Sequence, residues 1–211
     1  MLSLLSHELR SPLGVVRGYL RLLTQHQTEL SAHHRDAVAA ALKASDRCVD
    51  LLAEASALAQ MWRHERPIGR QPAVLGEVLQ RLTHAAGTID DRPVPIEIDS
   101  PADASLSAES PLLVTALASL VRAVHRAQPD EAAVSVSSRL TANAGRAGVT
   151  IQLAPRGLSL DAAPDLPLDL RRGGLGLSLP MAAAIVEAHE GTLAERRADG
   201  RMVVVVWLPT S

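Results

Sequence analysis

The sequence predicts an α+β protein in two parts: a two-helix hairpin that forms a dimeric four-helix bundle, and an α/β sandwich that follows it. Three observations predict this fold. The first 64 residues contain one proline and carry apolar residues spaced alternately by three and four positions. The rest of the chain alternates between helical patterns and short strand-like runs. With 211 residues, 47% of them hydrophobic and 21% charged, the chain can bury a core in both parts.

The first part predicts two helices, each with one narrow apolar seam. The seam of the first helix consists of Leu2, Leu5, Leu9, Leu13, Val16, Leu20 and Leu23. The seam of the second consists of Val38, Leu42, Ser45, Val49, Leu52, Ser56 and Ala59. A polar stretch, residues 25–34, connects them, which favours an antiparallel hairpin. One hairpin cannot cover both seams, so we expect a homodimer; the alternative is packing against the rest of the same chain.

The remaining elements are predicted from the periodicity of the apolar residues and from the positions of glycine and proline. Residues 63–72 are predicted to be a linker, because they carry Arg, Pro and Gly without an apolar period. The predicted helices are residues 74–86, 111–127 and 175–188. The predicted strands are residues 94–98, 133–140, 149–153, 192–197 and 201–208. The turns of the two expected hairpins contain Asn143, Gly145 and Gly148 in one and Asp199 and Gly200 in the other. A loop is expected over residues 155–174.

Composition excludes several classes of function. A formal net charge of −2 gives no basic surface for nucleic acid. The single cysteine, Cys48, excludes a disulfide framework and a cysteine-rich metal site. No apolar stretch reaches the roughly 18 residues that span a bilayer, and no signal-peptide pattern is present. We therefore expect a cytoplasmic protein with no membrane segment in this chain.

His7 lies off the apolar seam of the first helix. If Leu2 and Leu9 occupy heptad position a, His7 occupies the outward position f. An exposed histidine is ordinarily only a surface residue, but Glu8 beside it could relay a proton and make the imidazole a better nucleophile. The residues about one turn further on are Arg10, Ser11 and Pro12.

The segment 6–13, with the sequence SHELRSPL, resembles the H-box of bacterial sensor histidine kinases. Through Arg21, the helix is similar to their dimerisation and histidine-phosphotransfer domain. The resemblance implies that His7 is the phosphoacceptor and Glu8 its acid/base partner. Ser11 stands where the family usually has a Thr or Asn that orients water for phosphatase activity, and it keeps a hydroxyl there. We predict this domain over residues 1–66.

The partner implied by the resemblance is the receiver domain of a response regulator. Residues on the first helix could meet the acidic face of a receiver, and the alternative is an ordinary solvated charged face. The residues predicted to contact it are Arg10, Pro12, Arg17 and Arg21.

Residues 67–211 are similar to the catalytic ATP-binding domain of the same kinases, and we expect the corresponding α/β sandwich. The support is Gly174 and Gly176 before a predicted helix, together with residues 185–193, which resemble the second glycine box and the junction after it. Glycines before a helix can cradle phosphate, or can serve close packing.

The nucleotide-binding boxes depart from the family pattern. Ala118 and Arg122 stand where the family has the asparagines that hold magnesium, and the chain's one asparagine, Asn143, lies in a predicted turn. In the first glycine box, Pro155 replaces the adenine-reading aspartate, Gly157 remains, and Ser159 replaces a glycine. The phenylalanine of the lid is absent, because the chain contains no Phe.

These replacements predict that ATP and magnesium binding are lost and that this chain holds no cofactor. Magnesium requires hard oxygen ligands, and Arg122 supplies a cation instead. Pro155 offers no side-chain acceptor to the adenine amino group. The glycines that could still border the site are Gly157, Gly174 and Gly176.

The leading hypothesis is a phosphorelay protein. It would carry a phosphoryl group on His7 and exchange it with receiver aspartates, with magnesium supplied by the receiver. The alternatives are an active kinase core with an atypical nucleotide site and a non-catalytic scaffold that binds a receiver or kinase. A metal site at the hairpin tip is a weaker idea than exposed loop histidines. Its ligands would come from His26, Glu29, His33, His34 and Asp36.

Overall fold

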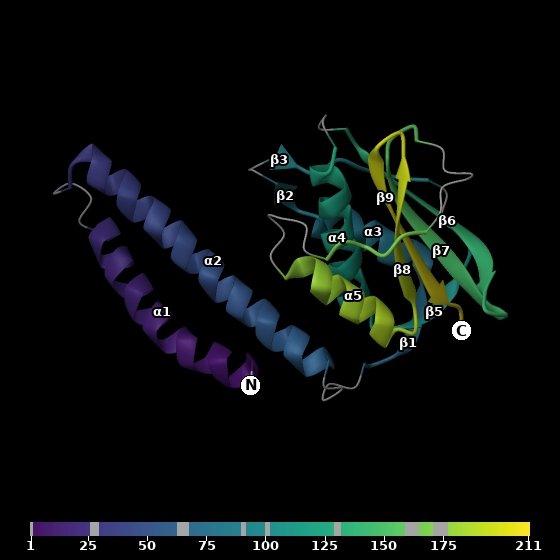
Figure 1. Ribbon diagram of the computed structural model, residues 1–211, viewed down its shortest axis with the longest axis horizontal. Helices are drawn as coiled ribbons and strands as arrows, with labels where there is room; N and C mark the ends of the chain where they lie inside the picture. Colours follow the sequence, from purple (N-terminus) through teal and green to yellow (C-terminus); the bar gives the residue numbers. More distant parts are fainter. Residues whose placement is uncertain are drawn as a thin grey trace. The chain divides into compact units, whose positions relative to one another are not determined.

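The chain divides into two compact units, Met1–Glu65 and Arg66–Ser211, in a computed structural model (Figure 1). The predicted boundary lies one residue later, between residues 66 and 67. The structure describes residues 2–25, 30–62, 68–89, 92–99, 102–128, 132–158, 165–170 and 177–211.

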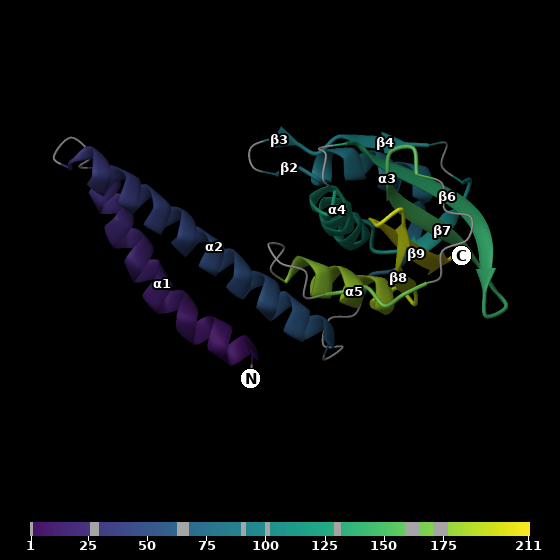
Figure 2. The ribbon, with the colours of Figure 1, turned by 45° about the horizontal axis from the view of Figure 1, so that its top comes forward.

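The helical unit is a hairpin of α1 (Leu2–Gln25) and α2 (Ala32–Trp62). The two helices lie side by side and run in opposite directions in both ribbon views (Figures 1 and 2). The α1 residues that are half-buried recur every three or four positions, so one side of α1 faces its neighbour. They are Leu13, Arg17, Leu20 and Thr24. On α2, Ser45 is buried and 5% exposed.

The predicted apolar seam of α1 is partly buried in the hairpin and partly exposed to solvent. Leu13 and Leu20 are half-buried in the hairpin. Leu9, Val16 and Leu23 remain 41–48% exposed. More apolar side chains extend this uncovered surface: Val15, Tyr19 and Leu22. The hairpin alone therefore leaves a broad apolar surface in water, which is unusual for a structure that is complete as a monomer.

The second unit contains a five-stranded sheet in the order β4-β6-β7-β9-β8. β4 is parallel to β6, and all other neighbours are antiparallel. The strands are β4 (Ile96–Ile98), β6 (Val134–Asn143), β7 (Arg146–Pro155), β8 (Thr192–Ala198) and β9 (Arg201–Pro209).

Three helices pack beside this sheet: α3 (Leu75–Ala85), α4 (Ser110–Arg126) and α5 (Ser178–Ala188). α4 contacts β7 and β9, and α3 and α5 flank it (Figure 2). Because α4 is covered on several sides, it is apolar around most of its circumference. Its completely buried residues include Leu113, Leu117, Leu120, Val121 and Val124. The predicted combination of a helical hairpin and an α/β sheet domain is confirmed.

Two small sheets complete the unit. β1 (Gln71–Val74) pairs with β5 (Ser105–Ala108), and β2 (Thr88–Ile89) pairs with β3 (Arg92–Pro93). The linker prediction was wrong for residues 71–72, because they pair with a strand more than 30 positions away.

Some predicted boundaries also differ. β6 and β7 are longer than expected, and the turn between them is Ala144–Gly145. Gly148 therefore lies within β7 and not in the turn. A Cβ atom there would lie 2.5 Å from the Trp207 ring and from the Leu208 carbonyl oxygen, so only glycine fits. The predicted helix at 175–188 begins at Ser178.

Among the helices described, none combines the length and hydropathy that a bilayer span requires.

Candidate functional site

The first candidate surface lies on α1 around position 7. His7 falls within the second turn of the helix, but its side chain and that of Glu8 lie outside the described part of the structure. The neighbouring Arg10, Ser11 and Pro12 are exposed, and Pro12 is contained within the helix. The surface thus offers a hydroxyl and a guanidinium to solvent near the predicted phosphoacceptor.

Helical spacing places position 7 on the same side of α1 as Ser11, Gly14 and Gly18. A Cβ atom built on either glycine meets no heavy atom within 4 Å. The half-buried residues that face α2 lie on another side. This side of α1 is therefore open at Gly14 and Gly18.

The three arginines predicted to contact a receiver have different surroundings. Arg10 and Arg21 are exposed. Arg17 is half-buried, and its Nε lies 2.7 Å from the Asp46 carboxylate on α2. Arg17 therefore already serves as a link between the two helices, whereas Arg10 and Arg21 present their charge to solvent.

The second candidate surface is the position where the resemblance expects nucleotide. Ala118 is buried, with 2% exposure, and offers no polar atom. Arg122 donates from Nη1 to the Ala86 carbonyl oxygen at 3.3 Å and from Nη2 to Ser119 Oγ at 3.0 Å. Ser119 in turn donates to the Thr115 carbonyl oxygen at 3.0 Å. The guanidinium thus joins α4 to the end of α3 and supplies no oxygen ligand.

The end of β7, where the resemblance expects adenine to bind, also lacks the expected polar side chain. Pro155 is buried opposite Val134 in the sheet. The next residue, Arg156, forms an ion pair with Glu97 at 2.9 Å. Gly157 has a φ of +77°, which explains why glycine is kept there. The turn is therefore retained without the carboxylate that would recognise adenine. Ser159, Gly174 and Gly176 lie outside the described residues.

A group of polar contacts that the sequence interpretation missed lies at the end of α5. His189 is 2% exposed; its Nδ1 donates to the Ile185 carbonyl oxygen at 2.7 Å, and its Nε2 accepts from the Glu109 amide at 3.1 Å. Burial lowers the pKa of His189 below 6.5. Beside it, hydrogen bonds from Arg70 and then Arg146 lower the pKa of Glu190.

The sequence gives little indication of this group. Residues 189–191 resemble only part of the connection between a helix and the following strand, and Arg70 and Arg146 come from distant segments. Arg146 lies close to the turn after α5 because β7 and β8 both pair with β9, and Arg70 directly precedes β1, which pairs with β5.

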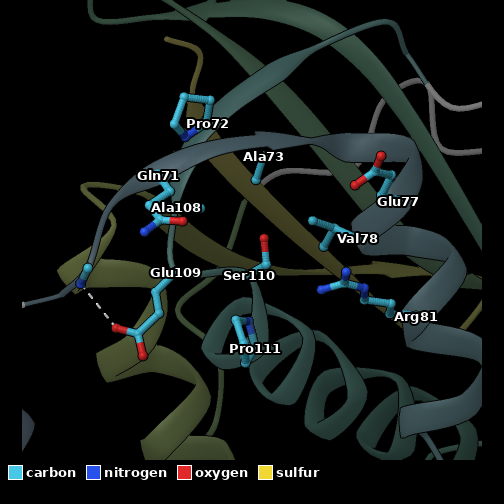
Figure 3. Close-up of a pocket in the computed structure, with 11 residues that line it drawn as sticks. Gln71, Pro72, Ala73, Glu77, Val78, Arg81, Ala108, Glu109, Ser110 and Pro111 are labelled. Carbon is cyan, nitrogen blue, oxygen red and sulfur yellow. Dashed lines mark hydrogen bonds between the residues drawn. The ribbon is translucent and has the colours of Figure 1, made fainter.

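A cavity of about 650 Å³ lies between α3, β1 and the start of α4 (Figure 3). Its charged side chains have both signs: Glu77 and Arg81 come from α3, and Glu109 precedes α4. Figure 3 shows the Arg81 guanidinium and the Ser110 hydroxyl directed toward the space between the elements. None of the sequence-predicted site residues lines this cavity.

The described residues contain no group of three side chains suited to a metal ion. His33 and His34 are exposed, and His34 Nδ1 lies 2.9 Å from the Ser31 hydroxyl. His26 and Glu29, which the alternative metal site requires, lie outside the described residues.

Two solved structures share the architecture of this chain. The structure of full-length ShkA in complex with AMPPNP has a TM-score of 0.67 at 20% identity, covering 100% of this chain and 46% of ShkA. The histidine kinase AdeS of Acinetobacter baumannii has a TM-score of 0.61 at 15% identity, covering 97% of this chain and 98% of AdeS. At these identities, the likeness concerns the fold.

The sequence comparisons agree with this likeness in fold. Residues 1–65 match the His Kinase A (phospho-acceptor) domain family. Over 205 residues the chain is 26% identical to Sensor-like histidine kinase SenX3 of Mycobacterium tuberculosis and of Mycobacterium bovis, covering 89% of this chain. These matches together support a sensor histidine kinase core. The chain spans about half the length of SenX3, at 48% of that protein.

Proposed function

We propose that this histidine kinase core carries a phosphoryl group on His7 and exchanges it with receiver aspartates. Its own ATP-dependent autophosphorylation is lost. In this proposal, the helical hairpin forms a homodimer, and a receiver domain docks on the open side of α1.

The observation that carries the proposal is the environment of Arg122. Its guanidinium is engaged with the Ala86 carbonyl oxygen and the Ser119 hydroxyl, at the position where a kinase of this family holds magnesium. A cation packed between two helices repels magnesium, and moving it away would leave the Ala86 carbonyl and the Ser119 hydroxyl without these hydrogen bonds. Pro155 adds to this, because its side chain has no acceptor for adenine.

The transfer itself needs little from the α/β unit. A neutral imidazole nitrogen of His7 attacks phosphorus, the P–O bond to the receiver aspartate breaks, and the aspartate leaves as a carboxylate. Glu8 takes up or holds the proton of the imidazole ring. The reverse reaction hands the phosphoryl group to a second receiver. Magnesium bound by the receiver neutralises the developing charge.

The uncovered surface of α1 supports the homodimer. Leu9, Val16 and Leu23 follow one another at intervals of seven residues and remain 41–48% exposed in the single chain. A second hairpin can cover this stripe in a four-helix bundle. The opposite charges of Arg17 and Asp46 are already paired within the hairpin, so apolar contacts would dominate the interface.

An active kinase core is the second candidate. The relatives favour it, because SenX3 is a sensor-like histidine kinase and the ShkA structure contains AMPPNP. The two candidates differ in the phosphoryl donor. The kinase would bind a magnesium–nucleotide complex, whereas the phosphorelay protein would accept phosphoryl groups only from a receiver.

A donor comparison tests the proposal. The full chain would be incubated with γ-labelled ATP and magnesium, and separately with a panel of receiver domains charged by a small phosphoryl donor. We expect acid-labile, base-stable label from a charged receiver and none from ATP. Label from ATP alone would establish the kinase and refute the proposal. An absence of label from both donors would refute it in favour of a non-catalytic scaffold.

A further inference from the structure

The segment that opens the α/β unit is held by two acidic residues from opposite parts of the sequence. The Gly69 amide donates to Glu109 Oε2 at 3.1 Å. Arg70 donates from Nη2 to the Ala188 carbonyl oxygen at 3.1 Å and pairs through Nη1 with the Glu190 carboxylate. These contacts attach residues 69–70 to the start of α4 and to the end of α5.

Glu190 binds a second arginine as well. Arg146, at the start of β7, lies 2.8 Å from the other carboxylate oxygen of Glu190. One carboxylate therefore joins the opening segment, the β6–β7 hairpin and the turn after α5. The depressed pKa of Glu190, caused first by Arg70 and then by Arg146, is consistent with this double pairing.

The backbone conformation at Glu190 indicates that its carboxylate is needed at this position. Its φ is +59°, in the left-handed region, where glycine is relaxed and a long side chain is strained. The strained position is occupied by a residue whose two oxygens each hold an arginine.

His189 connects the two acidic residues. Its Nε2 accepts from the Glu109 amide at 3.1 Å, and its ring is buried. The side chain of Glu109 holds Gly69, and the residue after His189 holds Arg70. The start of α4 and the end of α5 are thus connected through His189, and together they bind Gly69 and Arg70.

We propose that Arg70, Glu190 and Arg146 form a latch that keeps residues 69–70 fixed to the α/β unit. Its role in holding this segment does not depend on the proposed function.

Two variants separate the carboxylate from the backbone strain. Glu190→Gly removes both ion pairs and relaxes the backbone, whereas Glu190→Gln removes the charge and keeps the strain. The control is Glu187→Gln, because Glu187 is exposed on the same helix and its side chain is outside the latch. Hydrogen exchange measured by mass spectrometry on the full chain would follow peptides covering residues 69–74.

We expect exchange in these peptides to rise several-fold in both Glu190 variants and to be unchanged in Glu187→Gln. The midpoint of thermal unfolding should be retained in Glu190→Gly. Added salt should speed exchange of this segment in the wild type, because exposed ion pairs are screened, and should have no such effect in Glu190→Gly. Unchanged exchange in both Glu190 variants would overturn the latch.

Discussion

The open side of α1 and the corner between α4 and β7 offer very different surroundings to a phosphoryl group. On α1, Arg10 and Ser11 are exposed beside position 7. At the α4–β7 corner, Arg122 is hydrogen-bonded to its own unit, and Pro155 is buried in the sheet. The second unit nevertheless forms a five-stranded sheet packed against α4, with Ala118 and Pro155 buried in its interior. A fold does not by itself determine which ligand its site binds.

The largest expected effect concerns α1. His7→Ala should abolish labelling by a charged receiver, because His7 is the phosphoryl acceptor in the proposed function. The circular dichroism spectrum should be unchanged, since alanine favours helix. The matched control is His33→Ala, an exposed histidine of α2, which should label normally. Label remaining in His7→Ala would place the acceptor elsewhere and remove the contrast between the two regions.

A second prediction contrasts glycines of the two units. Gly148→Ala should lower the free energy of unfolding by about 3 kcal/mol, because the new Cβ would lie 2.5 Å from the Leu208 carbonyl oxygen. Gly18→Ala should instead leave stability equal or raise it by up to about 1 kcal/mol, because its surroundings are open and alanine favours helix. Urea unfolding of both variants measures the difference. Equal effects would show that the packing around Gly148 can yield.

A third prediction concerns the α4–β7 corner. Arg122→Ala removes the hydrogen bonds to Ala86 and Ser119 and should cost about 1–2 kcal/mol of unfolding free energy. Labelling of His7 by a receiver should be unaffected, because this residue acts in packing. Denaturant unfolding and the receiver assay check the two halves. A loss of labelling with unchanged stability would assign Arg122 a role in transfer.

The smallest effect is a pH dependence from His189. Its pKa is lowered in the folded state by burial, so the unfolded chain binds the proton more readily. The stabilisation is fully present above pH 6.5 and declines as the pH falls below this value toward the folded-state pKa. His189→Gln should unfold more easily at neutral pH and lose this part of the pH dependence. A pH profile of unfolding identical to that of the wild type would contradict the prediction.

Much of the fold could be predicted from the sequence. α3 and α4 were predicted to within about one residue, because each has a strong apolar period, and Pro111 marks the start of α4. β1 was missed because a four-residue strand has no period of its own and depends on β5 for its hydrogen bonds.

The candidate site shows the same division. Ser11 is exposed on α1, as the contiguous motif predicts, whereas the role of His7 stays a prediction because its side chain lies outside the described residues. The ion pair between Arg17 and Asp46 was not predictable, because both residues look like surface charges until α2 folds against α1. The contacts of Arg122 were equally invisible, since they depend on the end of another helix.

Trp207 provides an optical signal for the α/β unit. The chain has two tryptophans, Trp62 in α2 and Trp207 in β9, so each unit contains one tryptophan. Trp207 is 7% exposed, and its emission will shift to longer wavelength when the sheet opens to water. With Trp62 replaced by another aromatic residue, fluorescence would follow the melting of one unit while circular dichroism follows both.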